Sequence, residues 1–432
     1  FVHINVKAVL AAYKNEIEEA KEKAKEQFEA MKAMAEMEKA AGGDAPGAAP
    51  GPPMKLLQIF PGSIDILIEG LYQVESYDAG GNIGKDGVTV REAITLDKSG
   101  SIARALGAFK PLKEMMPALP ALDSFFAAGW INVDMKKLLA EYLALIEYAD
   151  AKMGLTEALG EAYIEEMKTS MKNSSGLLGN ALSVVISIPP AEEKQGIIAA
   201  TQVIEVTDEE AYRKEMARGT AAAQKMMAEV FGNLGVGDDA PKTTFTHKGD
   251  AEKIAGVSVD HMKIVIEMPV PEGAPPAGKE QMEMMMKLIY GPEGLLMRTA
   301  IVDGKAIVTF GGPGEMARAI AAVKGQKPGL GNSAALKGLC GKLPKGYSAV
   351  GFLSIPGFAQ MMSTMMQKMM HIMMPPGAEA PPAPKVEAPK LTSAIVAGLT
   401  VNGNVCRFDL HVPMAEILAG KEAITGMMGA MM

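Results

Sequence analysis

The chain contains few of the residues from which most recognisable sites are built. Its 432 residues include two cysteines, Cys340 and Cys406, and five histidines. Two cysteines are too few for a disulfide framework or a cysteine-rich zinc site. They could form one bridge or stay as two buried thiols, and the sequence leaves both open. The histidines are His3, His247, His261, His371 and His411. None of them stands at a spacing typical of metal ligands.

The chain also lacks a basic region and a long apolar run. Its net charge is −8, and no cluster of lysine and arginine interleaved with aromatic residues is present. Nucleic-acid binding needs a basic face that displaces counterions, so we expect no nucleic-acid partner. No stretch approaches the roughly 20 apolar residues of a transmembrane helix. Contact with a lipid or a membrane surface remains open.

Signatures of catalysis are missing as well. Gly329–Ala334 resembles a dinucleotide fingerprint but follows a helix and a loop rather than a strand. Gly311–Gly314 joins a strand to a helix, yet no P-loop lysine follows it. We therefore predict a protein that is not an enzyme, with no catalytic, cofactor-binding or metal-binding residue and no cofactor. A hydrolase is the alternative, and it would need a cleft with a Ser or Asp beside His247, His261 or His411.

A repeated pattern is the most informative feature that is present. Phe1–Tyr13, Leu119–Tyr142 and Leu343–Met362 each read as a short apolar strand, a turn and an apolar-periodic helix. The second and third copies also begin with Leu-Pro, whereas Phe1 starts just inside the matching strand. We therefore expect a missing N-terminal piece, such as a cleaved signal peptide or an anchor segment.

The two ends of the chain share a longer order of parts. A Gly/Ala/Pro tract follows the first helix at Gly42–Pro53, and another follows the third at Pro375–Pro389. Each is followed by a hairpin signal, Asp86-Gly87 or Asn402-Gly403, because these residues tolerate positive φ. The matching order predicts duplicated halves.

The remaining elements follow from periodicity and turn signals. Helices are predicted at Lys7–Ala40, Lys98–Leu106, Met135–Ala149, Thr156–Lys172, Glu209–Phe231 and Glu315–Val323. Strands are predicted at Val88–Leu96, Ala181–Ile188, Ile197–Val206, Thr243–His247, Val257–Met268 and Leu295–Phe310, the last with a turn at Asp303-Gly304. Lys55–Tyr77 is predicted as helix or strand leading into a strand, with Ser63–Tyr77 alternating enough for a sheet. Ser99 or Ser101, and Thr207 or Asp208, are predicted as N-caps.

These elements predict an α+β fold of duplicated strand–helix units, with largely antiparallel sheets and long amphipathic helices packed on one face. Three units are expected. Residues 1–118 form the first repeat unit, residues 119–342 a central extended unit, and residues 343–432 the third repeat unit.

The methionine-rich segment Phe358–Met374 is the most unusual part of the chain. Its methionines repeat at helical spacing, with His371 among them. A core-facing helix is one interpretation; a flexible apolar face for a hydrophobic ligand or partner is the second; and copper binding by thioethers is the third. The candidate ligand or partner face consists of Met361, Met362, Met365, Met366, Met369, Met370 and Met373.

Three segments resemble a family of uncharacterised bacterial envelope proteins that carry a domain of unknown function. The segments are TQVIEVTDEEAYRKEMA, LLMRTAIVDGKAIVTFGGPGEMARAIAAV and SAALKGLCGKLPKGYSAVGFLSIPGFAQMM. The resemblance consists of a strand that ends in Asp before a long helix, an x-V-x-D-G-x-x-V hairpin before a short helix, and a Leu-Pro strand. It implies an exported location and no known enzyme activity, and it transfers no functional residues.

Together these observations predict a non-enzymatic, exported protein of the periplasm or cell surface. It would be a structural or binding component of the envelope, associating with protein partners or with itself in a larger assembly. The alternatives are a carrier of lipid or another hydrophobic ligand and a Met/His copper binder.

Overall fold

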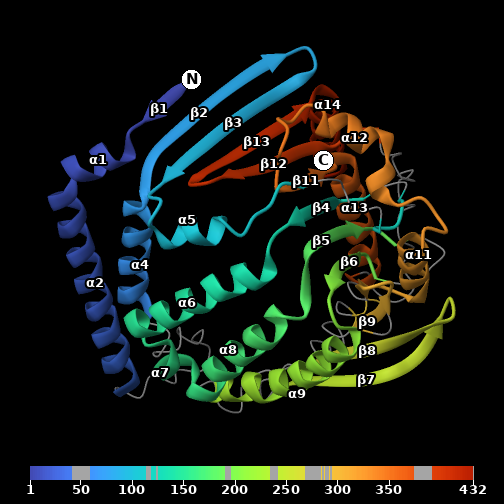
Figure 1. The fold of residues 1–432 in the computed structure, drawn as a ribbon, viewed down its shortest axis with the longest axis horizontal. Helices are drawn as coiled ribbons and strands as arrows, with labels where there is room; N and C mark the ends of the chain where they lie inside the picture. Colours follow the sequence, from blue (N-terminus) through green and yellow to red (C-terminus); the bar gives the residue numbers. More distant parts are fainter. Residues whose placement is uncertain are drawn as a thin grey trace.

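In the computed structural model the strands join into one large sheet (Figure 1). The structure describes residues 1–40, 59–112, 118–122, 125–189, 196–233, 242–267, 284, 287, 291, 294–373 and 392–431. In these residues the sheet has 13 strands in the order β1-β2-β3-β13-β12-β11-β4-β5-β6-β10-β9-β8-β7. Every neighbouring pair is antiparallel. The α+β class with a largely antiparallel sheet is therefore confirmed.

The strand bounds follow the apolar segments of the sequence closely. The strands are β1 (Val2–Ile4), β2 (Val74–Gly84), β3 (Gly87–Leu96), β4 (Ala127–Asn132), β5 (Leu178–Ser187), β6 (Ala199–Val206), β7 (Lys242–Ile254), β8 (Val257–Glu267), β9 (Leu295–Val302), β10 (Lys305–Phe310), β11 (Ala349–Leu353), β12 (Ile395–Asn402) and β13 (Val405–Pro413).

The helices vary from one turn to seven. They are α1 (Val6–Ala12), α2 (Lys14–Ala40), α4 (Ile59–Tyr72), α5 (Ser101–Leu106), α6 (Met135–Met153), α7 (Leu155–Leu159), α8 (Glu161–Ser175), α9 (Glu209–Asn233), α11 (Pro313–Val323), α12 (Ala334–Cys340), α13 (Ile355–Met373) and α14 (Met414–Met431), with a 3₁₀ turn at Leu330–Asn332. The predicted tracts Gly42–Pro53 and Pro375–Pro389 lie outside the described residues.

Turn and cap residues explain where several elements begin and end. Asp303 and Gly304 both have positive φ and join β9 to β10 as predicted. The other two hairpin loops are displaced by one residue, to Lys85-Asp86 and Gly403-Asn404. Asp208 caps α9 by accepting a hydrogen bond from Ala211 N–H at 2.9 Å.

Four local predictions are wrong. The single helix predicted at Thr156–Lys172 is divided at Gly160, whose φ of 106° separates α7 from α8. The segment expected to alternate as a sheet from Ser63 is helix α4 as far as Tyr72, and β2 begins only at Val74. The single long helix from Lys7 is interrupted at Tyr13, which separates α1 from α2. The N-cap of α5 is Gly100, rather than Ser99 or Ser101.

Successive helices form a layer beside the sheet (Figure 1). In α4, Asp65 pairs with Lys21 of α2 at 3.0 Å, and Phe60 stacks on Phe28 at a centroid distance of 4.7 Å. Farther along the layer, Arg218 of α9 pairs with Glu166 of α8. Helix α2 is therefore held against α4 through Lys21 and Phe28, whereas its Met31 and Met34 are exposed. No helix in the described part of the chain is both long and apolar enough to cross a bilayer.

The two faces of the sheet are covered differently. On one side, which we call the core face, Trp130, Val350 and Val396 are buried in a cluster with Met316 of α11 and Leu336 of α12.

Helix α9 lies against the opposite side of the sheet. Its Arg213 pairs with Asp260 at 2.6 Å, whereas Glu315 of α11 accepts a hydrogen bond from Thr201 on the core face. The strand registers place Asp260 and Thr201 on opposite faces. The prediction that the helices pack on one face is therefore not confirmed.

Strands from all three predicted units meet in the sheet. In its centre β11, from the third unit, pairs with β4 of the central unit. Farther out β13, from the third unit, pairs with β3 of the first. The three strand–turn–helix segments appear as β1 and α1, β4 and α6, and β11 and α13.

Candidate functional site: an open apolar sheet face

The side of the sheet opposite the core face is almost entirely apolar from β2 to β5. Side chains alternate between faces along a strand, so the strand registers define cross-strand rows on this side. Three rows over seven strands constitute what we call the apolar sheet face. The first row is Ala79, Glu92, Phe408, Leu399, Ala349, Ile131 and Leu182; the second is Gly81, Val90, Leu410, Ala397, Gly351, Gly129 and Val184; the third is Ile83, Val88, Val412, Ile395, Leu353, Ala127 and Ile186.

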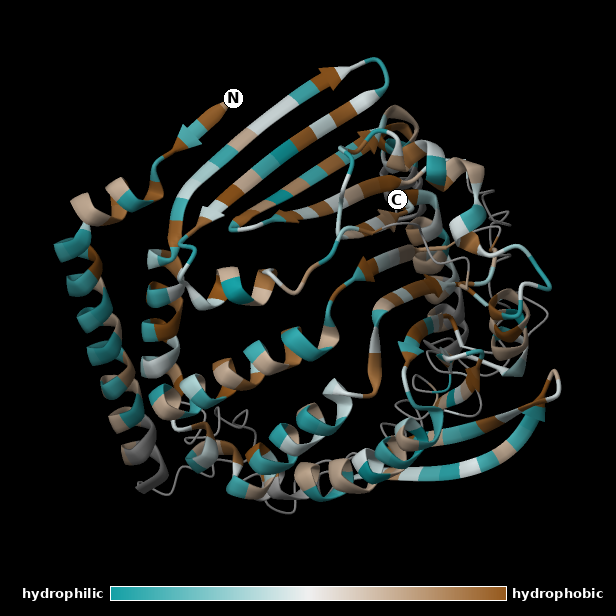
Figure 2. Cartoon of the chain, viewed as in Figure 1, coloured by the Kyte–Doolittle hydropathy of each residue, from teal (hydrophilic) through white to brown (hydrophobic). Residues whose placement is uncertain are grey.

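Several large side chains of this face are exposed. Ile83 is 80% exposed, Phe408 40% and Leu353 38%. On the core face of the central strands β4 and β11, Trp130 and Val350 are each 2% exposed. In Figure 2 the central strands are coloured largely as apolar, whereas α2, at the edge of the molecule, is coloured largely as hydrophilic. One face of the same strands is therefore buried, and the other is left open by the described residues.

The outer strands give an internal comparison. On the core face of β2 and β3, Asn82 and Arg91 are exposed, and both are polar. Arg91 reaches Asp409 of β13, and its side chain is 61% exposed. The chain thus places polar residues on an uncovered sheet surface there, as solubility requires. It does not do so on the apolar sheet face.

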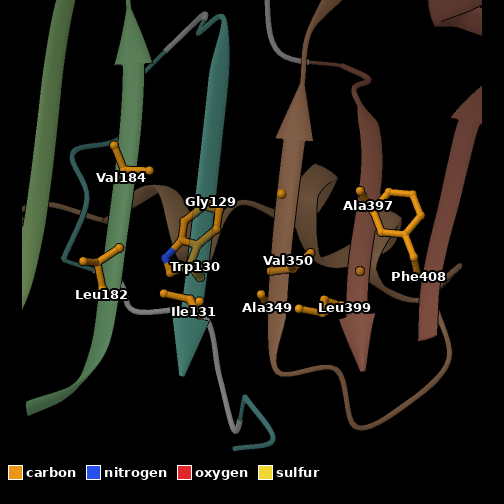
Figure 3. Close-up of a pocket in the computed structure, with 12 residues that line it drawn as sticks. Gly129, Trp130, Ile131, Leu182, Val184, Ala349, Val350, Ala397, Leu399 and Phe408 are labelled. Atoms are coloured by element: carbon orange, nitrogen blue, oxygen red, sulfur yellow. The ribbon is translucent and has the colours of Figure 1, made fainter. Parts of the chain in front are cut away.

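A hollow marks the centre of this face. Gly129 of β4 and Gly351 of β11 are direct cross-strand partners. Around them Val184, Ala397 and Leu399 line a groove of about 300 Å³ (Figure 3). The groove is lined by glycine and apolar residues.

Neither glycine is required by the backbone or by close packing. Both are absent from the glycines with positive φ. A Cβ at Gly351 would meet its nearest atom, the carbonyl oxygen of Ala128, at 3.9 Å, and one at Gly129 would meet Val350 O at 3.5 Å. Glycine inside a strand weakens it and often marks a close approach of another group. The missing side chains keep the hollow open.

Glu92 is the one charged residue in the three rows. It hydrogen-bonds the hydroxyl of Tyr77, which lies beside it on β2. Burial and the neighbouring Glu92 raise the pKa of Tyr77 above its usual value, so the phenol stays neutral. The carboxylate lies near the outer edge of the face and leaves the hollow itself without charge.

The predicted methionine face is separate from this surface. In α13, Met361, Met362 and Met365 are half-buried, whereas Met366 and Met369 are 40% and 37% exposed. The side chains of Met370 and Met373, together with Met374, lie outside the described residues. None of the described methionine side chains of α13 is in the buried cluster of the core. A ligand or partner role for this helix, copper binding included, stays a prediction.

The histidine side chains that the structure describes do not gather at one place. His3 contacts Asp78 at 2.6 Å, His261 contacts Glu252 at 2.7 Å, and His411 contacts Thr89 at 3.0 Å. Burial lowers the pKa of His411, which favours its neutral form. Within the described residues, no three His, Cys, Asp or Glu side chains are grouped as metal ligands.

The two cysteines are not bridged. Each is half-buried, Cys340 at the end of α12 and Cys406 on β13. Burial raises the pKa of both thiols, so the protonated form is favoured and nucleophilic reactivity is suppressed. Gly311–Gly314 is the turn into α11, where the Gly311 carbonyl accepts a hydrogen bond from Arg298.

Comparisons with known proteins identify no similar protein. No family model matches the chain, and neither the curated proteins nor the solved structures give a match. The resemblance to envelope proteins therefore stays a prediction. The sequence analysis did not predict the apolar sheet face, because the face depends on which strands pair, and the sequence does not show this.

Proposed function

We propose that this protein is a non-enzymatic, exported component of the bacterial cell envelope or surface that binds an apolar partner on its apolar sheet face. The observation that most supports this proposal is the contrast between polar and apolar open surfaces of the same sheet. Open surface on β2 and β3 is polar on one side, whereas 20 of the 21 positions of the apolar sheet face are apolar or glycine. Contiguous exposed apolar surface of this kind marks interaction sites in soluble proteins.

The proposed assembly role is supported by the energetics of covering this surface. Burial of apolar area contributes about 25 cal/mol per Å². A partner that covers the exposed ring of Phe408 and the side chains around it gains this contribution without ordering a new loop, because strands already hold them. We also propose that the strand–turn–helix segments at β1, β4 and β11 are repeats of one unit, as their common order supports.

Native mass spectrometry of the protein purified from its own cells tests the proposal. We expect added mass on the wild type, lost on mild denaturation, and absent from Phe408→Lys. Lysine is chosen because Glu92 is the cross-strand neighbour of position 408, and an opposite-charge pair there is compatible with the folded sheet. The matched control is Leu67→Lys on α4, an apolar residue that is 72% exposed and outside the face.

Two results would contradict the proposal. One is a wild-type chain that carries no added mass and binds no apolar fluorescent probe. The other is equal loss of the partner in both lysine variants, which would place the binding surface elsewhere.

A carrier of lipid or another hydrophobic ligand is the second candidate. The observation that favours it is the hollow of about 300 Å³ at Gly129 and Gly351. Small-molecule sites are usually apolar concavities of roughly this volume or more. Added mass of hundreds of daltons would favour the carrier, and added mass of tens of kilodaltons would favour a protein partner.

A further inference from the structure

The apolar sheet face has the size of a protein interface. Strands lie about 4.8 Å apart and rise about 3.4 Å per residue, so seven strands and three rows cover about 30 by 20 Å. That is about 600 Å² for one copy and about 1,200 Å² for two. Specific interfaces bury about 1,200–2,000 Å² in total. The relief of the side chains adds to the flat estimate, so two such faces reach the range of a stable dimer.

The face also contains a projection and a hollow that can complement each other. Phe408 of β13 forms one wall of the hollow and is 40% exposed, and the floor of the hollow, Gly351 of β11 and Gly129 of β4, lies in the adjacent row. A two-fold axis in the plane of the face, passing between β12 and β11 and inclined to the strands, would bring Phe408 of one copy over the hollow of the other. The same axis repeats the contact in reverse, as an isologous interface requires.

We propose that the partner of the apolar sheet face is a second copy of this chain, packed sheet against sheet. This inference rests on the proposed function and names its partner. Sheets pack face to face about 10 Å apart through interdigitating apolar side chains. In such a pair the ring of Phe408 fills the space above Gly129 and Gly351, whose lack of side chains then has a structural use. Glu92, on β3 toward the outer edge, lies at the rim, where interfaces tolerate charge.

Sedimentation equilibrium of the full chain tests this proposal. The wild type should have about twice the chain mass of 45.5 kDa. Phe408→Lys and Gly351→Leu should each raise the dimer dissociation constant at least about 100-fold, because each change occurs twice in a symmetric interface and alters its centre. Leu67→Lys should leave the dissociation constant unchanged. The fluorescence of Trp130, the one tryptophan, should remain that of a buried indole in Gly351→Leu.

The outcomes separate this inference from the proposed function. If the wild type stays monomeric at its highest soluble concentration, the proposal that the partner is a second copy of the chain is wrong. If that monomer carries a lipid or another protein that Phe408→Lys releases, the proposed function stands. A dimer that survives both Phe408→Lys and Gly351→Leu also overturns the inference, because its interface must then lie elsewhere.

Discussion

Two glycines on neighbouring strands should respond in opposite directions to the same substitution. Gly351 of β11 lies on the apolar sheet face, and Gly398 of β12 lies on the core face. At Gly398 a Cβ would be 2.9 Å from Leu343 Cδ1 and 3.7 Å from Tyr347 Cβ. At Gly351 the nearest atom is 3.9 Å away. Adding the same methyl group therefore tests which face is open.

The expected magnitudes follow from these contacts. Alanine in place of a strand glycine stabilises by about 0.5–1 kcal/mol where the space allows, because the unfolded chain loses conformational freedom. We expect Gly351→Ala to raise the free energy of unfolding by about that amount. Overpacking a core costs about 1–3 kcal/mol. Leu343 is 7% exposed and belongs to the buried cluster, so Gly398→Ala should lower the free energy of unfolding.

Urea unfolding followed by Trp130 fluorescence measures both changes at the centre of the sheet. The indole is 2% exposed and packs edge-on against Phe352 at 5.7 Å, so its emission should shift to the red when β4 and β11 separate. The measurement is made on dissociated chains, well below the dimer dissociation constant. Equal destabilisation by Gly351→Ala and Gly398→Ala would refute the reasoning, since Gly351 would then be covered within the chain.

Two further predictions concern the buried Glu416 and the half-buried Glu252, and both are measured with the same Trp130 fluorescence assay across a range of pH. Burial raises the pKa of Glu416, against hydrogen bonds from Ile355 N–H and Ser393. Its contribution to stability is therefore present at low pH and lost as pH rises through the folded-state pKa. Glu416→Gln should remove this loss. If the pH profile of the free energy of unfolding is the same in Glu416→Gln as in the wild type, Glu416 is not the group responsible. Burial opposes ionisation of Glu252, but hydrogen bonds from His261 and Arg298 outweigh it and lower the pKa. Glu252→Gln should cost about 1–3 kcal/mol at pH 7, and the cost should shrink as pH falls through the carboxyl pKa; a pH-independent cost would point to packing instead.

Local signals in the sequence were sufficient for many elements. The positive-φ pair Asp303-Gly304 fixed the β9–β10 hairpin, and Asp208 fixed the start of α9. Both signals act within a few residues, so no knowledge of the fold is needed to use them.

Helix α4 shows where local reasoning fails. Its apolar residues and Pro61 also suit a strand entry, and the helix is explained by its packing. A Cβ on Gly62 would be 2.3 Å from the carbonyl oxygen of Lys152 in α6. Glycine at this position therefore permits a close approach between two helices about 90 residues apart in the chain. Such a contact has no local signal, and the same is true of the pairing of β13 with β3.

The central strands carry a pattern that the described part of the chain does not explain. Strands that read as continuous apolar runs are usually buried on both faces, as in sheets between two layers of helices. The sequences of β4, β11 and β12 are AAGWIN, AVGFL and IVAGLTVN, which are apolar on both sides. The described residues cover one side, with Trp130, Val350 and Val396 in the core. The other side has the composition of an interior, which is typical of strands that a second layer covers. The contrast with Arg91 and Asn82, polar residues on open surface of the same sheet, supports the proposal that a partner supplies this second layer.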